Sequence, residues 1–130
     1  MKKLFIASLF TFASITSTQL MAHDLKPHMK QIASNFTSFN KATTTQEAIT
    51  ALMQMKQAVN ASKAILPHHI ENLPSTDAKV RQYYALYNQM DAHINHAIAL
   101  AKAGNLTEAK KVAAQLGAIK DQGHRIYKVY

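Results

Sequence analysis

Two side chains that can bind a haem iron stand far apart in this 130-residue sequence. Met29 lies near the start of the first segment with helical periodicity, and His124 lies near the end of the last one. A thioether and an imidazole together fill both axial positions of a haem iron, which leaves no open position for oxygen or substrate. If these two segments are antiparallel helices, both side chains lie at the same end of the fold.

Helical spacing allows both side chains to face inward. At about 100° per residue, Met29 lies about 40° from Leu25 on the apolar stripe of its segment, and His124 lies about 80° from Leu116. At a rise of about 1.5 Å per residue, each is some 8 or 9 Å from its end of the bundle. A methionine in an apolar stripe is also common core packing, and the helix dipole favours a histidine near a C-terminus. Periodicity alone therefore leaves both interpretations open.

Other histidines offer alternative ligands. His28 lies next to Met29, about 60° from the stripe centre on the other side, so a site formed by His28 and His124 is an alternative in which both ligands are imidazoles. Met29 points more nearly inward. His93 and His96 are three residues apart and could hold a metal together, but no carboxylate pattern completes a di-iron site around them.

The positions of these side chains depend on four predicted helices. Gly104 is the one glycine between residue 22 and the last helical segment, and alanine, lysine, glutamine and methionine are abundant, which favours helix. Thr44 and Asn105 are each followed three residues later by a glutamate, and this spacing predicts a capping box at two helix starts. The first helix is predicted to run from after Asp24 to near Phe39, and the second from after Thr44 to before Pro67. The third is predicted to run from about Asp77 to Ala103, and the fourth begins after Asn105.

Each helix carries an apolar stripe and has about 20 residues, which corresponds to a length of about 30 Å. The connections between the helices are mostly short, and only residues 67–75 form a longer loop. Helices that follow one another are therefore expected to lie side by side and antiparallel. We predict an all-α fold, an antiparallel up-down-up-down four-helix bundle.

Residues 1–22 have the pattern of a secretory signal that is cleaved from the protein. Lys2 and Lys3 precede an apolar stretch at residues 4–13, and Ala22 is a suitable small residue at a cleavage site. The apolar stretch is too short to span a bilayer. We therefore expect a secretory signal at 1–22 and one domain at 23–130, exported to a bacterial periplasm with no membrane span after cleavage.

The sequence contains no cysteine, so disulfides, thiolate ligands and a covalent c-type haem link are excluded. The formal net charge is +8, and removal of Lys2 and Lys3 lowers it to +6. This charge favours an acidic partner. Nucleic acid is a poor candidate, because the basic residues are spread over all four helices rather than clustered in a stripe.

The predicted domain resembles the cytochrome b562 family from its first residue to its last. The resemblance rests on His23-Asp24-Leu25 with Met29, on Ala51-Leu52 with Met55-Lys56, on Pro67, on Gly104 with Glu108-Ala109, and on His124 with Tyr127.

The resemblance implies one noncovalent b-type haem per chain, with Met29 and His124 as its axial ligands. The other residues expected to contact the cofactor are Leu25, Ile32, Tyr83, Tyr87 and Lys120. Tyr83 and Tyr87 occupy positions where the family packs aromatic rings against the porphyrin, and Lys120 is expected beside a haem propionate.

These observations predict a periplasmic one-electron carrier that exchanges electrons with a redox partner protein, for which the positive net charge favours an acidic one. Enzyme activity is not expected, because the sequence shows no nucleophile and base pair and only seven acidic residues. The alternative is a haem-free periplasmic helical protein that binds a metal or a protein partner through its basic, histidine-bearing surface.

Overall fold

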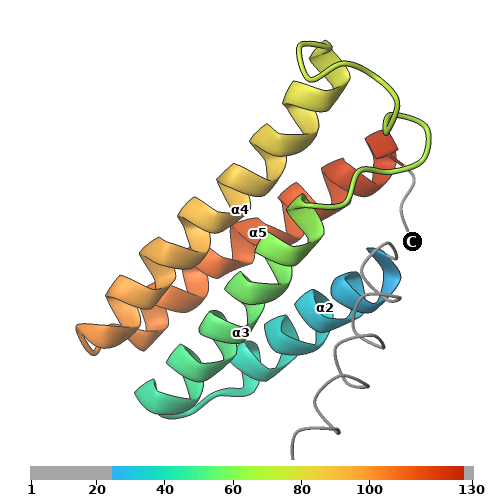
Figure 1. Ribbon diagram of the computed structural model, residues 1–130. Helices are drawn as coiled ribbons and strands as arrows, with labels where there is room; N and C mark the ends of the chain where they lie inside the picture. Colours follow the sequence, from blue (N-terminus) through green and yellow to red (C-terminus); the bar gives the residue numbers. More distant parts are fainter. Residues whose placement is uncertain (1–24, 128–130) are drawn as a thin grey trace, which may run out of the picture.

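Four α-helices form the part of the chain that the computed structural model describes, residues 25–127 (Figure 1). They are α2 (Leu25–Lys41), α3 (Thr45–Lys63), α4 (Ala78–Lys102) and α5 (Leu106–Tyr127). Consecutive helices run antiparallel and pack against each other, α2 on α3, α3 on α4 and α4 on α5. The predicted all-α four-helix bundle is confirmed. The predicted signal at 1–22 and the predicted cap Asp24 lie outside the described residues.

The helix ends agree with most of the sequence signals. At the start of α3, Oγ1 of Thr44 accepts a hydrogen bond from the backbone N–H of Glu47, and Oε1 of Glu47 accepts one from the N–H of Thr44, both at 3.2 Å. This capping box was predicted. α3 ends at Lys63, earlier than the sequence suggested. The N–H groups of Ala64 and Ile65 donate to carbonyls only three residues back, those of Ala61 and Ser62, so the α-helical bonding pattern stops there.

The turn between α4 and α5 depends on one glycine. Gly104 has a φ of +87°, a conformation that costs a side-chain-bearing residue free energy. With Gly104 in this conformation, the N–H of Asn105 donates to the carbonyl of Leu100 at 2.8 Å, and the N–H of Gly104 donates to the carbonyl of Ala101 at 3.0 Å. The pair of bonds is a Schellman motif, which satisfies carbonyls at the end of α4.

The capping box predicted at the start of α5 is wrong. Among the hydrogen bonds of the described residues, Oε1 of Glu108 accepts from Nζ of Lys111 at 3.0 Å and does not reach the N–H of Asn105. The N–H of Asn105 instead donates to the carbonyl of Leu100 in the turn that precedes α5.

The core is formed by the apolar stripes of all four helices. Its largest fully buried side chains include Phe39, Leu52, Met55, Tyr83 and Ile94. Between Leu25 and Tyr127, no helix is both long enough and apolar enough to cross a membrane.

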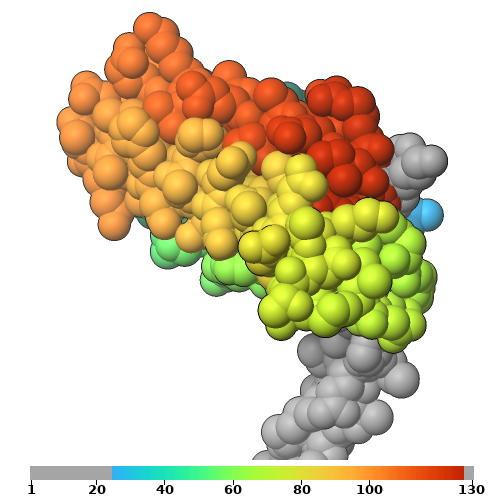
Figure 2. Space-filling view, turned by 90° about the horizontal axis from the view of Figure 1, so that it is seen from above, coloured from blue at the N-terminus to red at the C-terminus, as the bar shows by residue number. Residues whose placement is uncertain are grey.

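The backbones of the first and last helices, α2 and α5, come close to each other at far fewer places than the backbones of consecutive helices do. One contact joins them at the end where α2 finishes and α5 begins. There, Nζ of Lys110 donates to the backbone carbonyls of Asn40 at 3.1 Å and Ala42 at 2.8 Å. At the opposite end of the bundle, the connection between α3 and α4 lies beside the end of α5 (Figure 2).

Candidate functional site

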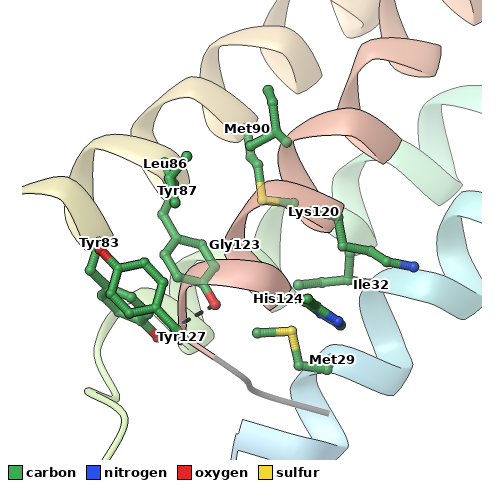
Figure 3. Close-up of a pocket in the computed structure, with 11 residues that line it drawn as sticks. Met29, Ile32, Tyr83, Leu86, Tyr87, Met90, Lys120, Gly123, His124 and Tyr127 are labelled. Carbon is green, nitrogen blue, oxygen red and sulfur yellow. Dashed lines mark hydrogen bonds between the residues drawn. The ribbon is translucent and has the colours of Figure 1, made fainter. Parts of the chain in front are cut away.

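A cavity opens at the end of the bundle where α5 finishes, between α2, α4 and α5 (Figure 3). The space between its walls is about 430 Å³, part of which is open to solvent. The walls are mostly apolar or aromatic. They are formed by Met29 and Ile32 of α2, Tyr83, Leu86, Tyr87 and Met90 of α4, and Ile119, Lys120, Gly123, His124 and Tyr127 of α5.

The structure brings Met29 and His124 to this one cavity. Met29 lies in the second turn of α2, and His124 lies in the last turn of α5. Because the two helices run in opposite directions, these turns are at the same end of the bundle. Figure 3 shows the thioether and the imidazole next to each other, and Nε2 of His124 is buried.

The surroundings of His124 favour its neutral form. Burial lowers the pKa of the imidazole below its ordinary value, and the positive charge of Lys120 lowers it further, whereas Asp121 acts in the opposite direction. A neutral imidazole is the form that binds a metal ion. The site is therefore suited to ligand binding at neutral pH.

Three tyrosines form one wall of the cavity. The ring of Tyr83 meets the rings of Tyr87 and Tyr127 edge to face, with centroids 4.9 Å and 5.1 Å apart. Oη of Tyr83 donates to the carbonyl of Ile65 at 2.8 Å. Oη of Tyr127 donates to the carbonyl of Lys79, also at 2.8 Å. The protein backbone thus provides the hydrogen-bond partners that these buried hydroxyls need.

The tyrosine hydroxyls stay neutral. Burial raises the pKa of Tyr83, Tyr87 and Tyr127 above the ordinary value. The neighbouring tyrosines raise the pKa of Tyr83 further. This wall therefore presents uncharged rings to the cavity.

Six of the seven residues predicted to contact the cofactor or its iron line the cavity: Met29, Ile32, Tyr83, Tyr87, Lys120 and His124. The seventh, Leu25, is buried with 8% of its surface exposed, but it is not among the lining residues. It is the first residue of α2, one turn away from Met29.

Other lining residues were not predicted as site residues. Met90 could have been found from the sequence, because it follows Tyr83 and Tyr87 on the same helix face at a spacing of four and three residues. Gly123 faces Leu86, whose Cδ1 would lie 3.8 Å from a Cβ atom at position 123. A larger residue at position 123 would therefore fill part of the cavity.

The alternative ligand His28 is on α2 but does not line the cavity. It is partly buried, and its Nδ1 atom has no hydrogen-bond partner among the described residues. The same residues contain no group of three or more histidine and acidic side chains that could hold a metal ion, so His93 and His96 are not part of such a group.

Fold and cavity together define a four-helix bundle with a mostly apolar cavity at one end. A family model described as Cytochrome b562 matches residues 24–128. The match spans all four helices, and the chain belongs to the cytochrome b562 family. It is a haem-binding electron-transfer cytochrome, and b-type haem is the cofactor of this family, whose members are electron carriers.

Proposed function

We propose that this cytochrome is a periplasmic one-electron carrier that holds one b-type haem noncovalently, with Met29 and His124 as its axial ligands. The observation that carries the proposal is that these two donors, from the first and last helices, line one cavity. Neither side chain could reach the other without the antiparallel packing of the bundle.

The residues present fit this cofactor. The cavity is partly open to solvent and is lined mostly by apolar and aromatic side chains, the lining that cofactor sites usually have. Its walls combine apolar side chains with a thioether and a neutral imidazole, and this donor set occurs at haem iron in electron carriers. The sequence has no cysteine, so binding would be noncovalent.

Bound haem supplies a reversible one-electron couple to the protein. The chain would hold the haem iron with Met29 and His124 and would exclude water with apolar walls. Ile32 and Leu86 contribute to these walls from opposite sides. Lys120 lines the cavity and extends outward past His124 (Figure 3), where its ammonium group is suited to pair with a propionate carboxylate.

The periplasmic location is supported by the basic and apolar pattern of residues 1–22, as described above. The partner we propose is a redox protein with an acidic docking surface, because the domain without Lys2 and Lys3 has a net charge of +6. Opposite charges steer such partners together and speed their association.

The proposal is tested by purifying the exported protein and recording its visible spectrum. We expect a Soret band that shifts and sharpens on reduction with dithionite. The intact mass of the exported protein should be that of a chain that begins at His23. A colourless protein that also fails to take up added haemin would support the haem-free alternative. Retention of residues 1–22 would contradict the proposed location.

A matched set of variants tests the ligands. Met29→Ala and His124→Ala should each remove the low-spin spectrum. The controls are Met53→Ala on α3, where the side chain is 47% exposed, and His96→Ala on the exposed face of α4. If a control variant loses the low-spin spectrum and the corresponding ligand variant keeps it, the assignment is wrong.

A further inference from the structure

The cavity contains a second thioether besides that of Met29. Met90 lines it from α4, so that three helices each contribute one uncharged metal-binding side chain: Met29 from α2, Met90 from α4 and His124 from α5. Met90 lies on the wall that faces the other two (Figure 3). Met90 is buried, with 5% of its surface exposed, so its thioether is accessible mainly from within the cavity.

The chemistry of these donors selects one kind of metal ion. Thioethers are soft ligands that favour Cu(I), and imidazole also suits copper. Among the residues that line the cavity there is no carboxylate for a hard cation. The ammonium group of Lys120 at the same cavity repels a divalent ion more strongly than a monovalent one.

We propose that the cavity, when it does not hold haem, is a binding site for one Cu(I) ion, with the thioethers of Met29 and Met90 and the imidazole of His124 as ligands. Methionine side chains have three rotatable bonds, which allows Met29 and Met90 to turn toward a shared ion. The step is simple coordination, in which no bond in the protein is broken and no electron is transferred. The Cu(I) site does not depend on the haem function, although haem and copper would compete for the same cavity.

The test uses the full chain prepared without haem, under anaerobic conditions with ascorbate to keep copper reduced. Cu(I) is titrated against the chromophoric chelator bathocuproine disulfonate. We expect one tightly held ion per chain. Met90→Leu and Met29→Leu keep the apolar volume but remove the sulfur. Each should weaken Cu(I) binding by roughly tenfold or more, because even the loss of a group that only orients a metal ligand typically costs about 10–100-fold in affinity.

Two control variants separate this site from surface binding. Met53→Leu removes an exposed thioether on α3, and a double change of His68 and His96 to alanine removes two exposed imidazoles that do not line the cavity. Both should keep full Cu(I) affinity. Loss of binding in the double histidine variant, with full affinity in Met90→Leu, would overturn the proposal.

A measurement on the unchanged protein covers the case in which a variant fails to fold. X-ray absorption at the copper edge should show sulfur and nitrogen neighbours, and a spectrum with nitrogen or oxygen alone would overturn the proposal. Haemin titration of the same preparation is read separately by its Soret band. Haem uptake without Cu(I) binding would refute only the copper site, whereas Cu(I) binding without haem uptake would refute only the proposed carrier function.

Discussion

Tyr127 ties the last turn of α5 to the first turn of α4, because its Oη donates a hydrogen bond to the carbonyl of Lys79 at 2.8 Å. His124 lies three residues earlier in the same turn, so this bond helps to fix the position of the proposed ligand. The ring of Tyr127 also contacts Tyr83 at 5.1 Å and His69 at 6.0 Å. The end of α5 is therefore anchored through both the polar and the apolar part of one side chain.

Tyr127→Phe should lower the stability of the haem-free protein. The change removes one hydrogen bond to a partly buried carbonyl, which is worth about 1 kcal/mol. For a domain of about 100 residues, this corresponds to a fall in Tm of roughly 4–8 °C. Thermal unfolding followed by circular dichroism measures it. Tyr84→Phe is the control, because the described hydrogen bonds include none from the hydroxyl of Tyr84, and equal losses in both variants would contradict the role of the bond.

The axial pair makes a spectroscopic prediction. Met29→Ala should abolish the weak near-infrared charge-transfer band that a thioether gives to ferric haem and should lower the reduction potential. His124→Ala should cost most of the haem affinity. His28→Ala should change neither property, because His28 does not line the cavity. A loss of low-spin character in His28→Ala, with Met29→Ala spectrally silent, would transfer the ligand role to His28.

The lowered pKa of His124 makes stability depend on pH. The unfolded chain protonates this imidazole at about pH 6.5, whereas the folded protein resists protonation to a lower pH. Between these two values the unfolded state binds more protons, so the free energy of unfolding decreases as the pH falls. Urea unfolding of the haem-free protein between pH 7 and pH 5 should show this decrease, and His124→Gln should reduce it.

Lys120→Gln tests how much the charge of Lys120 contributes to the lowered pKa of His124. Removal of the positive charge should raise the pKa of His124 toward its ordinary value, and titration of the imidazole resonances by NMR measures this shift. The change Lys111→Gln is the matched control, since Lys111 pairs with Glu108 at the other end of α5. If the titration of His124 is unchanged in Lys120→Gln, burial rather than the charge of Lys120 lowers the pKa of His124.

Two glycines should respond in opposite ways to substitution by alanine. Gly117 is within α5, and no atom lies within 4 Å of the position of a Cβ atom there, so Gly117→Ala should stabilise the helix by roughly 1 kcal/mol. Gly104 has a φ of +87°, so Gly104→Ala should destabilise the protein instead. Chemical unfolding of the haem-free protein gives both values. Stabilisation by both changes would contradict the role of Gly104 in the turn.

Much of the fold was predictable from the sequence because its signals are local. The Thr44 and Glu47 box and Gly104 determine helix ends within a few residues, and the apolar stripes determine which faces are buried. The box at Asn105 did not form because the N–H of Asn105 donates to the carbonyl of Leu100 in the preceding turn, and a spacing pattern does not show this bond.

The cavity was predictable in part. Met29 and His124 could be placed at one end from helix direction alone. The sequence could not show that Leu25 falls outside the lining or that Leu86 and Ile119 belong to it, because this depends on how far each helix is rotated against its neighbours. The hydroxyl partners of Tyr83 and Tyr127 are backbone carbonyls far away in the sequence, and only tertiary structure reveals them.

The contact of Lys110 with the carbonyls of Asn40 and Ala42 joins the first and last helices at the end of the bundle distant from the cavity. At the cavity end, Tyr127 connects α5 to α4 through its ring contact with Tyr83 and its hydrogen bond to Lys79. Met29 and His124 line the cavity from α2 and α5. An iron bound by both side chains would therefore also link the first and last helices at this end, so that cofactor binding would stabilise the folded bundle.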